Sequence, residues 1–165
     1  MSVITTGGSP KIRKGNLIVF LSLFFSLQVF ALPSPTDQFS EAKKLITEGQ
    51  YAEAEASVRE LIARQPSPEG FDLLGYIYEQ QRMLDRAEDA YGQALKLDAG
   101  RHFSKVRLGI VYGKEGKYAD CVAILEGVYA DVRGDPEALF YLCRAYLEVG
   151  KTDKALETAE IVEGL

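Results

Sequence analysis

Apolar residues recur every three or four positions along most of residues 36–165, and this spacing predicts amphipathic helices. In residues 71–78, Phe71, Leu74, Gly75 and Tyr78 stand at positions i, i+3, i+4 and i+7. A short polar or glycine-containing break follows this segment, and a second amphipathic segment then covers residues 86–95. Two such segments joined by a short break predict a helical hairpin.

The same residue types return along the chain at a spacing of 33 or 34 residues. One column holds only small side chains, at Ala42, Gly75, Gly109 and Cys143. A second column holds a large side chain, at Leu45, Tyr78, Tyr112 and Tyr146. A third column is again small, at Ala54, Ala87, Cys121 and Ala155. Several columns in one register predict an internal repeat.

These columns explain how each hairpin would pack. Small residues at both small columns let the two helices approach closely, and the tyrosine column fills the space that remains. A hairpin alone cannot bury both of its faces, so successive hairpins are expected to stack. A glycine marks the break between helices at Gly49, Gly116 and Gly150, whereas Arg82 interrupts this column.

The pattern resembles the tetratricopeptide repeat family. Residues 68–101 match its small and large positions best, at Leu74, Gly75, Tyr78, Ala87, Tyr91 and Ala94. Further repeats cover residues 102–135 and 136–165, and a degenerate first repeat covers residues 35–67, where Glu41 replaces the usual leucine. The resemblance implies an all-α fold, an α-solenoid of about four hairpins wound as a right-handed superhelix.

Residues 1–31 have the pattern of a secretory signal sequence. Lys11, Arg13 and Lys14 precede an almost purely apolar stretch, residues 17–31. At about 1.5 Å per residue this stretch spans about 22 Å as a helix, short of the ~30 Å core of a bilayer. We expect cleavage after Ala31, a linker over residues 32–35 and export to the periplasm or the medium. Retention as an uncleaved anchor is the alternative.

The net charge of the chain limits the classes of molecule that it can bind. The formal net charge is −5, and removal of residues 1–31 leaves 16 basic against 24 acidic residues, a net charge of −8. A surface this acidic repels phosphate backbones and anionic membranes. We therefore expect a protein or peptide partner, with no nucleic acid and no membrane contact beyond the signal segment.

The family resemblance implies that the first helix of each repeat lines a concave face that binds extended peptides. By register, repeat one offers Phe39, Lys43 and Ile46, and repeat two offers Asp72, Tyr76 and Glu79. The candidate groove residues are Tyr76, Phe103, Val106, Arg107, Ile110, Lys114, Phe140, Tyr141, Arg144 and Leu147. Aromatic and arginine side chains are typical anchors of binding sites. The alternative is that Phe103, Ile110 and Phe140 complete the core between helices.

Known chaperone-binding members hold a terminal carboxylate on this face with lysine, asparagine and arginine. Of the matching positions here, only Arg107 fits, so that ligand is not supported.

Few residues are suited to catalysis or to metal binding. Two cysteines exclude a four-thiolate site, and the single histidine, His102, excludes a two-histidine zinc motif. Cys121 and Cys143 are either packing thiols or a disulfide that joins repeats three and four. No nucleophile and base can be paired, and we predict no cofactor and no enzymatic activity.

We therefore predict an exported, non-catalytic scaffold or adaptor that binds a protein segment in its concave groove. The alternative function is a structural subunit of a cell-envelope assembly that docks through an uncapped C-terminal helix. Leu156, Ile161 and Val162 lie on this last helix. Their partial exposure would mean either simple fraying or the docking of a partner or a second copy.

Overall fold

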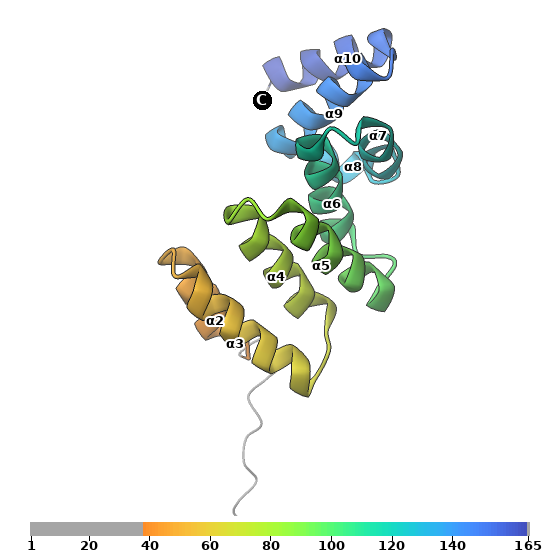
Figure 1. Cartoon of the computed structure of the whole chain (residues 1–165). Helices are drawn as coiled ribbons and strands as arrows, with labels where there is room; N and C mark the ends of the chain where they lie inside the picture. Colours follow the sequence, from red (N-terminus) through yellow and green to blue (C-terminus); the bar gives the residue numbers. More distant parts are fainter. Residues whose placement is uncertain (1–37, 165) are drawn as a thin grey trace, which may run out of the picture. The chain divides into compact units, whose positions relative to one another are not determined.

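The computed structural model describes residues 38–164, in which every regular element is a helix (Figure 1). In chain order the helices are α2 (Ser40–Thr47), α3 (Tyr51–Arg64), α4 (Pro68–Gln80), α5 (Leu84–Leu97), α6 (His102–Glu115), α7 (Tyr118–Glu126), α8 (Tyr129–Val132), α9 (Pro136–Glu148) and α10 (Thr152–Glu163). Contacts divide the chain into residues 1–34 and 35–165, and all of these helices belong to the second unit. The predicted signal segment and cleavage point lie outside the described residues.

The helices pair and stack as the repeat pattern predicts. Helices α2 and α3, α4 and α5, α6 and α7, and α9 and α10 form antiparallel pairs. Each pair packs on the next, because α3 contacts α4, α5 contacts α6, and both α6 and α7 contact α9. This arrangement confirms the all-α fold of stacked hairpins. No helix within residues 38–164 is both long and apolar enough to cross a bilayer.

Local sequence sets where two of the leading helices begin. Helix α4 starts with Pro68 after Ser67, whose hydroxyl accepts a hydrogen bond of 3.2 Å from the amide of Gly70. Helix α9 starts with Pro136 after Asp135, whose carboxylate accepts one of 3.0 Å from the amide of Ala138. The capping side chain bonds one free amide of the first turn, and proline removes another because it has no N–H.

The turn inside each hairpin has the same backbone geometry in all four repeats. Gly49, Gly116 and Gly150 have φ near +75° to +79°, and Arg82 takes the same left-handed conformation at φ 59°. The amide of the next residue then donates to a carbonyl five residues back, as from Met83 to Tyr78 at 2.8 Å. Arg82 therefore replaces glycine in sequence without changing the turn, at the cost of a strained backbone.

Close approach within the hairpins depends on the small columns. A methyl group at Gly75 would lie 2.6 Å from Cε1 of Tyr91, and one at Gly109 would lie 2.4 Å from Cδ2 of Leu125. Neither distance is compatible with van der Waals contact. The predicted role of these two glycines in helix packing is confirmed.

The buried side chains form two hydrophobic clusters that meet at α6. One cluster joins α2 to α5 and includes Leu108 and Val111 of α6. The other joins α7 to α10 and includes Val106 and Ile110 of the same helix. Helix α6 thus presents a separate face to each half of the repeat domain.

The third repeat departs from the others in its second helix. Helix α7 ends at Glu126, and after Gly127 the chain continues as the short helix α8. Val128 and Val132 are both buried in the second cluster. The break therefore redirects the backbone without removing these side chains from the core.

Candidate functional site

A buried carboxylate, Glu79, lies at the junction between α4 and α6, on the side of the leading helices that the family resemblance predicts to be concave. Its side chain is 1% exposed and accepts hydrogen bonds from the Tyr91 hydroxyl at 2.8 Å, from Arg107 Nη2 at 2.6 Å and from Lys114 Nζ at 2.9 Å. Four side chains from three helices therefore satisfy one another. The charges of Arg107 and Lys114, two of the predicted groove residues, are engaged inside the protein.

Glu137 extends this network to α9. Arg107 Nη1 lies 2.9 Å from Glu137 Oε2, and Lys114 Nζ lies 2.8 Å from Glu137 Oε1. Burial alone would raise the pKa of Glu137, but the hydrogen bond from Lys114 and the charge of Arg107 outweigh it and hold the pKa below its ordinary value. The network consequently links the leading helices of repeats two, three and four. We call Glu79, Tyr91, Arg107, Lys114 and Glu137 the Glu79 network.

A second buried carboxylate, Asp72, lies on the same face of α4. It accepts a hydrogen bond of 2.5 Å from the Ser104 hydroxyl and forms an ion pair with Arg101. Burial raises the pKa of Asp72, although the bonds from Ser104 and Arg101 oppose this shift. Positions read from the sequence as groove lining are, in repeat two, contacts to the next repeat.

The predicted groove residues of repeat three divide into core and ion-paired side chains. Val106 and Ile110 are buried in the second cluster. The guanidinium of Arg107 lies over the Tyr76 ring at 5.9 Å, and the ammonium of Lys114 lies over the Tyr141 ring at 5.7 Å. For Ile110 the core alternative holds, whereas for Phe103 and Phe140 it is wrong, because both rings are exposed.

Two hollows remain on the concave side. One of about 210 Å³ is lined by Tyr76, Phe103, Leu73, Arg101, Asp72 and Glu69. The other, of about 450 Å³, is lined mainly by polar side chains, including Lys114, Glu137, Tyr141 and Arg144. The structure therefore does not bring the candidate groove residues together on one continuous accessible surface.

Three predicted residues lie instead on an apolar face formed by α9 and α10. Phe140 and Leu147 are 56% and 57% exposed, and Arg144 lies between them on α9. Together with side chains of α10 they surround a hollow of about 410 Å³, lined by Phe140, Cys143, Arg144, Leu147, Ala159, Val162 and Glu163. We call these seven residues the α9–α10 face.

Two members of this face, Ala159 and Glu163, were missed by sequence reasoning. The signal was present, since Ala159 stands 34 residues after the buried Leu125. The family resemblance places the groove on the first helix of each repeat, so the second helices contributed no groove candidates.

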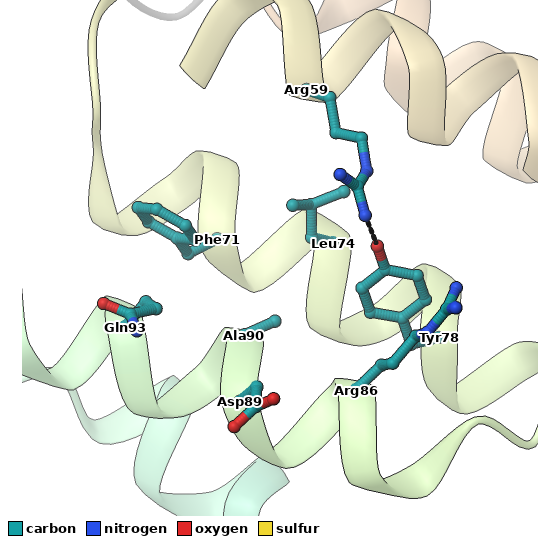
Figure 2. Close-up of a pocket in the computed structure, with 8 residues that line it drawn as sticks. All are labelled: Arg59, Phe71, Leu74, Tyr78, Arg86, Asp89, Ala90 and Gln93. Atoms are coloured by element: carbon teal, nitrogen blue, oxygen red, sulfur yellow. Dashed lines mark hydrogen bonds between the residues drawn. The ribbon is translucent and has the colours of Figure 1, made fainter. Parts of the chain in front are cut away.

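A further hollow lies between α3, α4 and α5 (Figure 2). It measures about 330 Å³, and its rim holds Arg59, whose Nη2 donates a hydrogen bond of 2.7 Å to the Tyr78 hydroxyl. The hollow contains Ala90 at the position where the next repeat has the larger Ile124. A small side chain thus accounts for it, and Arg59 and Tyr78 are already bonded to each other.

The two cysteines are free thiols in the structure. The Cys121 thiol points to the carbonyl oxygen of Tyr141 at 3.8 Å, and the Cys143 thiol points to that of Ala155 at 3.4 Å. The structure therefore has the packing thiols of the first alternative, with each sulfur against a different carbonyl and no disulfide between them. Burial raises the pKa of Cys121 to about 11, which keeps this thiol protonated at neutral pH.

The single histidine has a surface contact. Nδ1 of His102 lies 2.8 Å from Oδ2 of Asp131, and both side chains are exposed. Within residues 38–164 no group of three or more His, Cys, Asp or Glu side chains is placed to hold a metal ion.

Comparison with known families decides the identity of the fold. Two tetratricopeptide repeat profiles match the chain, one over residues 39–102 and one over residues 114–162. The chain belongs to the tetratricopeptide repeat family. Repeats of this family are protein-interaction modules, so this tetratricopeptide repeat protein is a non-catalytic scaffold or adaptor and not an enzyme.

Solved structures with this fold include several of MamA. The MamA fragment from residue 41 to the end of Desulfovibrio magneticus RS-1 shares 22% identity, with a TM-score of 0.70, and the match covers 80% of this chain and 76% of that one. Another crystal structure of MamA shares 18% identity over 94% and 95% of the two chains, with a TM-score of 0.68. At this identity the similarity shows the fold alone. A search of curated proteins gives no match.

Proposed function

We propose that this tetratricopeptide repeat protein is an exported adaptor that docks on another protein through its α9–α10 face. The observation that carries the proposal is the exposure of Phe140 and Leu147, more than half of each side chain, around an apolar hollow. Apolar side chains gathered around a hollow lose unfavourable contact with water when a partner covers them. A scaffold already rigid before binding loses little entropy on association.

The concave side is a weaker candidate for the main docking surface. An extended peptide there would have to contact Arg107 and Lys114, whose charges are already neutralised by Glu79 and Glu137. Breaking the pair between Arg107 and the buried Glu79 would leave a buried charge without its partner, which costs about 3–5 kcal/mol. A peptide that engages Tyr76 and Phe103 alone remains our second candidate, because Phe103 is half exposed beside a separate hollow.

Export is part of the proposal and is supported by residues 1–31. Their basic start, apolar run and small residue at position 31 match a secretory signal. N-terminal sequencing of the protein from its native cells should return Leu32 as the first residue. A chain that retains Met1 and sediments with membranes would support the anchored alternative instead.

Photo-crosslinking in the native cells tests the docking surface. Benzoylphenylalanine is placed at Leu147 on the α9–α10 face, at Phe103 on the concave side, and at Leu156 as a control. Leu156 is 61% exposed on α10 but does not line the hollow. We expect a crosslinked protein from position 147 and none from position 156.

The positions that yield crosslinked products distinguish the competing functions. A product from position 103 alone would favour the concave groove, and the absence of products from positions 103 and 147 would reject both docking surfaces. Mass spectrometry of a product from position 147 distinguishes an envelope-assembly subunit from a second copy of this chain.

A further inference from the structure

Each of the first three hairpins presents the same repeat position to the helix that covers it. Phe39, Asp72 and Val106 occupy this position and are all buried. The Phe39 ring lies against Gly70 at the start of α4, and Asp72 accepts a hydrogen bond from Ser104 at the start of α6. The fourth member of the column is Phe140, which no helix of the described chain covers.

A second column, seven residues or about two turns further along each leading helix, repeats this relation. Glu79 is covered by Arg107 of α6, and Gly113 is covered by Tyr141 of α9, whose Cβ would lie 2.8 Å from a methyl group at Gly113. Arg107 and Tyr141 are themselves equivalent, 34 residues apart. The fourth member of this column is Leu147, which is equally uncovered.

The covering helices share one pattern of side chains. A small residue occupies their first contact position, at Gly70, Ser104 and Ala138. A larger side chain follows three residues later, at Leu73, Arg107 and Tyr141. Leucine follows at four residues, at Leu74, Leu108 and Leu142, and an aliphatic residue at seven, at Ile77, Val111 and Ala145. Positions i, i+3, i+4 and i+7 form one face of a helix.

We propose that the α9–α10 face binds an amphipathic helix of another protein that carries this pattern. The small residue would lie on Phe140, and the larger residue three positions later would lie on Leu147. Arg144 borders the hollow on α9 and Glu163 borders it on α10. The helix that fits therefore carries an acidic residue toward α9 and a basic residue toward α10. This inference rests on the docking function proposed above and specifies its partner.

The first helix of a second copy does not fit this role. At the repeat positions where α4, α6 and α9 have leucine and an aliphatic residue, α2 has Glu41 and Lys44, and both are exposed. Head-to-tail stacking of two copies would bury these charges in an apolar hollow, which is unfavourable. The outer side of α2 is therefore a polar cap, whereas the α9–α10 face is an acceptor.

Binding of a designed helix tests the pattern directly. The probe is a stapled 16-residue peptide with Ala, Tyr, Leu and Val at positions i, i+3, i+4 and i+7 and with glutamate and lysine on opposite flanks. The control peptide has the same composition with its apolar residues spread around the helix. Fluorescence anisotropy with the full mature chain should show affinity about tenfold or more higher for the probe.

Protein variants locate the site. Leu147→Glu should abolish binding of the probe, whereas Leu156→Glu should leave it unchanged, and circular dichroism checks that both variants fold. Equal binding of probe and control peptide would overturn the helix pattern, even if crosslinking at position 147 supports docking. A dimer that Leu147→Glu dissociates and that excludes the probe would overturn it in favour of a second copy.

Discussion

The junction between α4 and α6 is polar at repeat positions where the junction between α6 and α9 is apolar, although Glu137 of α9 also pairs with Arg107 and Lys114 of α6. At equivalent repeat positions the first has Asp72, Tyr76 and Glu79, and the second has Val106, Ile110 and Gly113. Of these six residues, Tyr76 is partly buried and the other five are buried. Two different kinds of interaction thus hold successive repeats together at these positions.

The two kinds of junction should lose stability in different ways when one residue is substituted. A buried ion-pair network offsets the cost of desolvation only while all its members are bonded, and loss of one member leaves the others unpaired. An apolar junction loses stability in proportion to the contacts removed. Substitutions at equivalent positions should therefore have unequal effects.

The largest effect is expected at Glu79. Glu79→Ala leaves Arg107, Lys114 and the Tyr91 hydroxyl without their shared acceptor, and we expect a loss of about 3–5 kcal/mol in the free energy of unfolding. Urea unfolding measures it. Glu79→Gln keeps an acceptor and should lose less, so an equal loss in both variants would contradict the network argument.

A somewhat smaller effect is expected in the apolar junction. Ile110 is fully buried, and Ile110→Ala should cost about 2–4 kcal/mol through lost contacts and the cavity that remains. Ile110→Val, which removes one methylene group, should cost about 1 kcal/mol. The same urea experiment applies, and a loss greater than that of Glu79→Ala would reverse the comparison.

The ion pairs that Glu137 of α9 makes with Arg107 and Lys114 of α6 should make the stability of the fold depend on acid. Because the pKa of Glu137 is lowered in the folded state, its contribution is present above the unfolded pKa of about 4.3 and is lost as pH falls through the folded pKa. The difference in Tm between the native chain and Glu137→Gln should therefore shrink below about pH 4. Asp72, whose pKa is raised, acts in the opposite direction, since its protonation favours the folded state. A difference in Tm that is constant from pH 7 to pH 3 would contradict the prediction.

The smallest effect is expected at the left-handed turns inside the hairpins, where backbone conformation and not side-chain packing decides stability. Arg82→Gly relieves a left-handed residue and should stabilise the protein by about 0.5–1 kcal/mol. Gly49→Ala, at a position with no atom near the added methyl group, should destabilise it by about 1 kcal/mol. If Arg82→Gly were destabilising, contacts of the arginine side chain would outweigh its backbone strain.

The fold was predictable from the repeat columns because each column reflects one packing requirement. Gly75 and Gly109 were interpreted correctly, since only a small residue fits against Tyr91 and Leu125. The left-handed turn at Arg82 was not predictable from its residue type. The break between α7 and α8 also left no clear sign beyond Gly127.

The candidate site was predicted less well, for a physical reason. Helical periodicity identifies which side of a helix a residue occupies, but it does not show whether the neighbouring repeat covers that side. Arg107 and Lys114 were therefore interpreted as binding residues, although they bond to Glu79 and Glu137. Phe140 and Leu147 were selected as lining of a groove along the leading helices, and in the structure they line the hollow between α9 and α10.

Membership of α6 in both hydrophobic clusters has a consequence for dynamics. Opening either half of the domain strips contacts from one side of α6 while the other side keeps its neighbours. The amides of Leu108 to Val111 should therefore exchange with deuterium more slowly than those of α2 or α10, each of which packs at one end of the stack. Local unfolding that begins at α10 would then leave the first two repeats intact.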